Sequence, residues 1–165
     1  MTIHLENEAD IQLDFDYNEL IDRVVHECLD YENCPFEAEI SILLTNDNEI
    51  GEINRQFRNQ DKPTDVLSFP AIEFGMAGDF SHINDSDSEY FNPETGELIL
   101  GDIVISVDRA INQAEEYGHT VIREIAFLVA HSMFHLMGFD HISDEDRLLM
   151  ESKQEDVLKR LKIFR

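Results

Sequence analysis

Apolar and polar residues alternate in two short stretches of the N-terminal half, around residues 3–5 and 40–44, and this alternation predicts two strands. Between them, residues 17–31 carry apolar side chains at helical spacing, and Pro35 follows the end of the expected helix. The chain is therefore predicted to begin with the order strand, helix, strand.

The middle of the chain adds another helix and two more strands. Asn46 is suited to cap the helix, whose apolar stripe runs to Phe57. A third strand is expected to begin at Val66, after Pro63. Residues 98–107 form a predicted buried strand, because they are apolar and β-branched with few interruptions.

The C-terminal third is predicted to be helical. Ser106, Thr120 and Ser143 are each placed to cap a helix. Gly118 and Gly138 are suited to end the first two of these helices in a left-handed conformation. The complete order, β-α-β-α-β-β-α-α-α, predicts an α/β (α+β) fold with a mixed sheet of about four strands and about five helices.

The composition fits one domain over residues 1–165, since 42% of the residues are hydrophobic and 29% are charged. We expect neither membrane insertion nor secretion, because no apolar stretch is long enough to span a bilayer and no leader pattern is seen. Cys28 and Cys34 are too few for a disulfide framework, so a cytoplasmic protein is expected. Residues 75–97 form one long acidic loop, for which we expect disorder or a partner-facing insertion.

The net charge excludes some classes of partner. Thirty-six acidic and twelve basic residues give −24, which repels nucleic acids and anionic membranes at long range. DNA and membranes are therefore not expected as partners. The few cations gather at Arg55, Arg58 and Lys62 and again in the tail, residues 159–165, so a local anion-binding site is still compatible with the charge.

Three histidines in residues 131–141 give the clearest chemical signal. His131 and His135 lie one helical turn apart, so both imidazoles project from the same face. Gly138 lets the chain leave the helix and turn back, which brings His141 towards the other two. Three neutral imidazoles suit one Zn²⁺ or a similar ion with the fourth position open to water, as in catalytic sites. We therefore predict a metal site on the penultimate helix and the turn that follows it.

The spacing of these histidines is also that of the metzincin proteases, which place a glutamate directly after the first histidine as the general base. Ser132 occupies that position, and its hydroxyl cannot act as a base near neutral pH. The metal site is thus predicted without a protease's catalytic group.

Three segments together resemble the YbeY endoribonucleases, which are cytoplasmic bacterial rRNA maturation factors. Residues 131–141 are similar to the family's histidine motif, and residues 57–70 and 100–106 are similar to two further family motifs in the expected order. The match covers residues 54–146 and keeps all three histidines, Gly138 and Asp140. The family pattern explains neither the serine at position 132, where glycine is usual, nor the acidic loop.

The resemblance implies a zinc-dependent endoribonuclease that prefers single strands and acts on the end of small-subunit rRNA and in ribosome quality control. By this resemblance, His131, His135 and His141 hold the metal, and Arg58 contacts the scissile phosphate. Its partners would be ribosomal RNA and the ribosome or ribosomal proteins. A guanidinium can form a bidentate clamp on a phosphate, and Arg55 and Lys62 lie close enough in sequence to add local attraction.

Several other polar residues leave alternatives open. Asp65 and Asp102 are candidates for a general base, although a strand-end or turn carboxylate is the plainer interpretation. Asp140 is suited either to orient a metal-bound histidine or to fix its own turn. The remaining histidines are expected at the surface or in capping positions; they are His4, His26, His82 and His119.

Two other functions compete with the nuclease. One is a non-enzymatic ribosome assembly factor in which the metal is structural, and the other is a metal-dependent hydrolase of a different substrate class. Because the net charge opposes RNA binding, we expect weak activity on naked RNA and a partner that delivers the substrate. The sequence leaves the oligomeric state open.

Overall fold

The computed structural model describes residues 1–84 and 89–164. Its elements follow the predicted order. They are β1 (Thr2–Asn7), α1 (Tyr17–Tyr31), β2 (Ala38–Thr45), α2 (Asp47–Arg58), β3 (Val66–Pro70), β4 (Leu98–Ser106), α3 (Val107–Tyr117), α4 (Val121–Leu136) and α5 (Asp144–Arg160).

The strands form one mixed sheet in the order β1-β2-β4-β3. β1, β2 and β4 are parallel, whereas β3 runs antiparallel to β4 and forms one edge. The predicted α/β class with a mixed four-stranded sheet is thus confirmed. Because β3 is an edge strand, α2 on one face of the sheet and α4 on the other both contact it.

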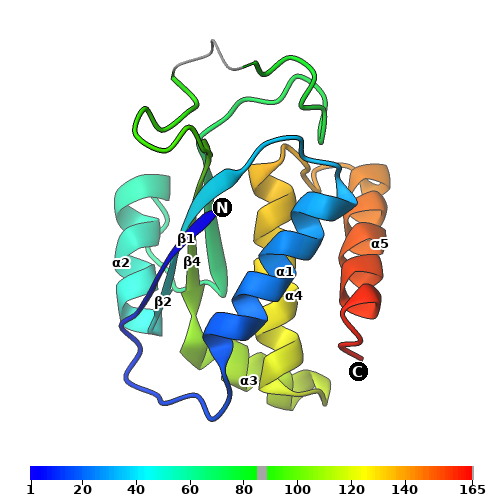
Figure 1. The fold of residues 1–165 in the computed structure, drawn as a ribbon. Helices are drawn as coiled ribbons and strands as arrows, with labels where there is room; N and C mark the ends of the chain where they lie inside the picture. Colours follow the sequence, from blue (N-terminus) through cyan, green and yellow to red (C-terminus); the bar gives the residue numbers. More distant parts are fainter. Residues whose placement is uncertain (85–88, 165) are drawn as a thin grey trace.

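Helices cover the two faces of the sheet unequally. α2 packs on one face, and α1, α4 and α5 lie on the other, with α3 at the end of the sheet (Figure 1). The main core lies between the sheet and α1 and α4, and a small second cluster of Ile50, Leu67 and Val104 lies beneath α2. α4 is buried along most of its length, so the residues on its C-terminal turn are held by a rigid element.

The helix caps follow the sequence prediction. Asn46, Ser106, Thr120 and Ser143 each accept a hydrogen bond from the backbone N–H three residues later. Such bonds satisfy donors that the first turn of a helix leaves free. Gly118 ends α3 in the left-handed conformation, as expected.

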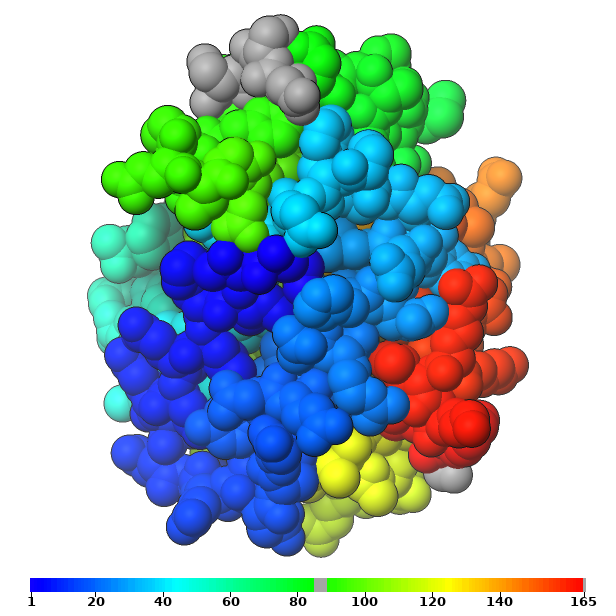
Figure 2. Space-filling model, viewed as in Figure 1, coloured from blue at the N-terminus to red at the C-terminus, as the bar shows by residue number. Residues whose placement is uncertain are grey.

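Of the long segment between β3 and β4, the described residues 71–84 and 89–97 lie at the end of the molecule near the C-terminus of α1 (Figures 1 and 2). The expectation of disorder over residues 75–97 is wrong for the described part of that loop, since Phe80 and Ile83 are buried in the core; residues 85–88 lie outside the described residues. The backbone N–H of Gly78 also donates to the carbonyl of Met137 over 2.9 Å, at the end of α4. The buried apolar residues of this segment are isolated and follow neither a helical nor a strand period, so their packing could not be predicted from the sequence.

Candidate metal centre and cleft

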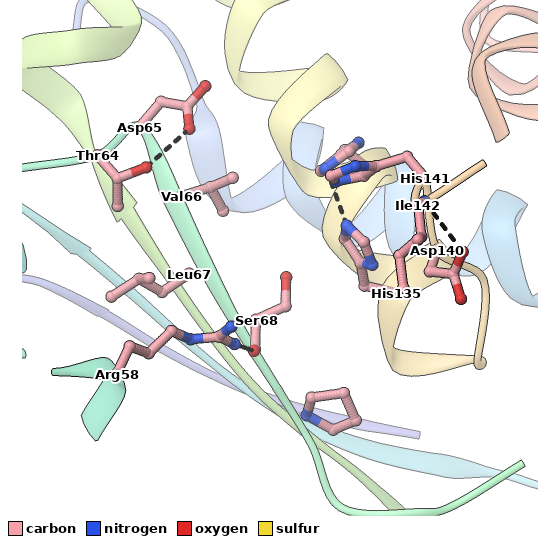
Figure 3. A pocket seen from close by; sticks show the side chains of 12 residues that line it. Arg58, Thr64, Asp65, Val66, Leu67, Ser68, His135, Asp140, His141 and Ile142 are labelled. Carbon is pink, nitrogen blue, oxygen red and sulfur yellow. Dashed lines mark hydrogen bonds between the residues drawn. The ribbon is translucent and has the colours of Figure 1, made fainter. Parts of the chain in front are cut away.

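The last turn of α4 brings the first two predicted ligands together. The Nε2 atoms of His131 and His135 lie 3.1 Å apart, and His141 returns from the following turn, as Figure 3 shows. One nitrogen from each of the three side chains lies within 4.8 Å of the others, so the group could hold a metal ion. The structure therefore brings all three predicted ligands to one point.

The Nδ1 atoms of His131 and His135 have protein partners. Nδ1 of His135 lies 2.9 Å from the carbonyl oxygen of Phe139, and Nδ1 of His131 lies 3.4 Å from Oε1 of Gln154. A carbonyl oxygen only accepts, so each Nδ1 carries the proton and each Nε2 presents a lone pair. Two lone pairs facing each other at this distance fit a shared cation, and outer hydrogen bonds of this kind orient metal-binding histidines.

Burial keeps these imidazoles in the form that binds metal. Burial, together with a smaller charge repulsion from the neighbouring His131, lowers the pKa of His135 from 6.5 to about 4. Burial likewise lowers the pKa of His131 below its ordinary value. Both rings are consequently neutral at pH 7 and can bind a metal ion without first losing a proton.

The histidines form one wall of a cleft of about 550 Å³. The opposite wall is β3 with the C-terminal end of α2, and it carries Arg58, Asp65 and Ser68 (Figure 3). The edge strand β3 therefore lies between the Arg58 guanidinium and the candidate metal site.

Arg58 is positioned by the end of α2. Asn59 adopts a left-handed conformation directly after it and turns the chain away from the helix. The guanidinium donates to the backbone carbonyl of Ser68 and lies 5.3 Å from the ring centroid of Phe69. Arg58 thus spans the edge of β3 and faces the cleft, although its side chain remains exposed.

Asp65 also lines this cleft, and a buried chain of polar groups lies behind it. Nε2 of Gln113 donates to Glu124 over 2.9 Å and to Asp65 over 3.4 Å. Glu124, whose side chain is 4% exposed, also pairs with His119 at 2.5 Å. The expectation that His119 is a surface or capping residue is therefore wrong, because its ring is 8% exposed and bonded to a buried carboxylate.

The other candidate base lies elsewhere. Asp102 is exposed on β4 and lines a different hollow, together with His4 and Ser41. The cleft described above is not lined by Asp102, so the structure does not bring it to the histidines. Of the two carboxylates, only Asp65 reaches the cleft.

Of the remaining predicted residues, some lie at or near the cleft and others lie elsewhere on the surface. Arg55 pairs with Glu52 on the surface of α2 and does not line the cleft, whereas Lys62 lines a neighbouring hollow. Asp140 accepts from the backbone N–H of Ile142 over 3.2 Å, which fits the turn-fixing alternative. As expected, His4, His26 and His82 are exposed.

One functional residue was missed by the sequence analysis. Gln154 is fully buried on α5, on the same face as Met150 and Val157. An amide within an apolar helical stripe requires a polar partner, and that requirement was the available signal. Here the partner is His131.

Comparison with known proteins shows the family. The model of the family described as "Endoribonuclease YbeY" matches residues 3–162. This chain belongs to that family. Among YbeY proteins, it is 49% identical over 165 residues to "Endoribonuclease YbeY" of Lachnoclostridium phytofermentans and 50% identical over 169 residues to that of Lachnospira eligens. Both matches cover 100% of each chain.

A solved structure shares the fold of this chain. The solution structure of TM1509 from Thermotoga maritima is similar with a TM-score of 0.57 at 23% identity, and the match covers 97% of this chain and 91% of that one. Separately, no helix among the described residues is long and apolar enough to cross a membrane.

Proposed function

We propose that this chain is a metal-dependent endoribonuclease that cleaves single-stranded RNA. The observation that carries the proposal is the arrangement of the cleft, in which three histidines face Arg58 across the edge of β3. Cleavage of a phosphodiester needs an activated nucleophile and stabilisation of the charge that develops on the phosphoryl oxygens. Membership of a family of endoribonucleases supports RNA as the substrate.

Each wall supplies a part of this chemistry. A divalent ion held by the histidines, which we take to be Zn²⁺, would polarise a phosphoryl oxygen or lower the pKa of a water molecule. Arg58 binds the phosphate through its guanidinium and offsets the developing negative charge. Asp65 is the carboxylate of the cleft wall opposite the histidines that is placed to accept a proton.

The groove continues beyond Arg58. A neighbouring hollow of about 670 Å³ shares Arg58, Thr64, Asp65 and Leu67 with the cleft and is also lined by Lys62 and Arg109. Cations along a groove favour binding of a nucleic-acid backbone. This local arrangement offsets part of the repulsion from a net charge of −24.

We further propose that the substrate is the end of small-subunit rRNA. The protein then acts in the cytoplasm, in rRNA maturation and ribosome quality control. The ribosome or a ribosomal protein delivers the RNA. The net charge of −24 supports delivery by a partner, because free RNA is repelled at long range.

The structure disfavours the peptidase alternative. Ser132 stands where a metzincin has its general base, and its side chain is fully buried and does not line the cleft. A structural metal in a non-enzymatic assembly factor would not require Arg58 to face the histidines.

The test is cleavage of a labelled single-stranded RNA carrying the rRNA end, with added Zn²⁺. We expect His135→Ala to lose cleavage and Arg58→Ala to lower kcat/KM roughly 100-fold. Arg55→Ala is the matched control, because it removes the same charge from the same helix outside the cleft. Equal cleavage by all four proteins would indicate a contaminating nuclease, and intact RNA with cleaved peptides would favour another hydrolase. Ribosome binding that survives Arg58→Ala, together with no turnover of any RNA by the wild type, would favour the assembly factor.

A further inference from the structure

An aromatic pair, the exposed Phe57 and the half-buried Phe69, lies beside Arg58. Phe57, on α2, is 64% exposed, although it lies directly before the guanidinium-bearing residue. Its ring meets the ring of Phe69 edge to face, with centroids 5.7 Å apart and an interplanar angle of 70°. Most of the Phe57 ring is therefore available for contact with a ligand.

The two rings border an open hollow of their own. It is lined by Phe57, Arg58, Gln60, Phe69 and Pro70, so its walls combine ring faces with one guanidinium and one amide. Arg58 also lines the cleft with the histidines and the hollow with Lys62. The aromatic pair therefore begins where the phosphate-binding part of the cleft ends.

We propose that Phe57, supported edge to face by Phe69, forms a stacking platform for a nucleobase of single-stranded RNA, next to the phosphate bound by Arg58. This inference rests on the proposed function and specifies how its substrate is held. Aromatic side chains beside a cationic groove bind single strands, because every base offers a ring face for stacking. The positive charge at the edge of the platform selects a base that is attached to a phosphate rather than an apolar peptide.

The platform gives a physical reason for a preference for single strands. In a duplex the bases are stacked on their neighbours, so none is free to cover Phe57. Because stacking does not read base edges, we expect the preference to be tolerant of sequence, with Gln60 as the residue able to bond to a base edge.

The composition of the chain makes the test direct. The protein contains no tryptophan, so Phe57→Trp introduces one fluorescent indole on the platform. Phe164→Trp is the matched control, since Phe164 is also 64% exposed and does not line this hollow. The probe is a short 2′-O-methyl phosphorothioate oligonucleotide, titrated at low salt as a single strand and as a duplex with its complement. We expect the single strand to quench Phe57→Trp and to leave Phe164→Trp unchanged, and the duplex to quench less.

Affinity measurements separate stacking from general apolar contact. Phe57→Ala and Phe57→Leu should each weaken binding of the single strand roughly 10-fold, whereas Phe57→Tyr should retain it. Phe164→Ala should bind like the wild type. Circular dichroism confirms that each variant is folded, which we expect because residue 57 lies at the surface.

The outcomes distinguish this inference from the nuclease proposal. Quenching without cleavage by any form of the protein would support the platform and overturn the nuclease. Cleavage with no quenching, and with unchanged affinity in Phe57→Ala, would overturn the platform alone. Failure of the wild type to bind the single strand would also overturn it. Loss of self-association in Phe57→Ala, without a change in oligonucleotide affinity, would assign the ring to a protein interface instead.

Discussion

The carbonyl oxygen of Phe139 lies 2.9 Å from Nδ1 of His135, four residues earlier. The turn that ends α4 therefore folds back and fixes the ring of a residue on the last turn of the same helix. Gly138, with a φ of 97°, makes this return possible. A ligand held in this way keeps one tautomer, so the candidate site is oriented before a metal ion arrives.

Gln154 is expected to control metal affinity through His131. Gln154→Leu removes the acceptor at Nδ1 of that ring, and affinity for Zn²⁺ should fall roughly 10- to 100-fold, as measured by competition with a chelator. Gln154→Glu retains an acceptor and should bind Zn²⁺ more tightly than Gln154→Leu. Equal affinity of the two variants would show that this contact does not orient the ring.

Gly138→Ala should damage both the fold and the metal site. An added Cβ would lie 2.7 Å from Cβ of Phe74, and the backbone conformation disfavours a side chain. We expect a loss of about 2 kcal/mol or more in the free energy of unfolding, together with weaker Zn²⁺ binding. Gly96→Ala is the comparison, because its φ of 74° carries similar backbone strain in open space. If the two variants lose equal stability, contact with Phe74 is unimportant.

Ser132→Ala should stabilise the protein. The Oγ atom is buried without a hydrogen-bond partner among the described residues, and alanine is the better helix former. We expect a gain of about 1 kcal/mol in urea unfolding, with RNA cleavage unchanged. Ser152→Ala, on the exposed face of α5, should gain less because it changes helix propensity alone. Destabilisation by Ser132→Ala would mean that the hydroxyl has a partner, such as a water molecule.

Gln113→Leu should destabilise the protein by about 2 kcal/mol, because a buried carboxylate then loses a donor. The single amide of Gln113 serves both Glu124 and Asp65, so the same change also frees Asp65 in the cleft. We expect kcat for RNA to fall more than KM rises. The neighbouring Asn112 is exposed, and Asn112→Leu should leave both stability and kcat close to the wild type.

The metal-free protein should lose stability in acid through His135. Its pKa falls from 6.5 to about 4 on folding, so the unfolded chain binds the proton more readily than the native state. The contribution of His135 is fully present above pH 6.5 and is lost as the pH falls from 6.5 towards 4. Urea unfolding of the wild type and His135→Gln over this range isolates the effect, since the carboxylates titrate in both. A difference that does not vary with pH would contradict the assignment.

Local signals made much of the fold predictable. The four cap residues and the periodicity of the helices are encoded by neighbours in sequence, and the structure confirms the predicted order of elements. The position of β3 at the sheet edge was not predictable in this way, because strand order depends on contacts between distant segments.

The residues of the candidate site were likewise predictable only in part. The spacing of His131, His135 and His141 predicted their convergence, and Arg58 followed from the resemblance to the family. The choice between Asp65 and Asp102 could not be made, because β4 is apolar at nearly every position and lacks the alternation that assigns a side chain to one face. The contact between Gln113 on α3 and Glu124 on α4 was not predictable either, because it depends on how two helices pack together.

The connection between β3 and β4 is far longer than antiparallel neighbours need, since two residues can join such strands. Its additional length packs Phe74 and Gly78 against the turn between His135 and His141. The geometry of the metal site is therefore maintained in part by a surface segment that supplies no ligand to it. A partner that pulls on residues 74–78 would move His141 relative to the two helical histidines, and would thereby change metal affinity without entering the cleft.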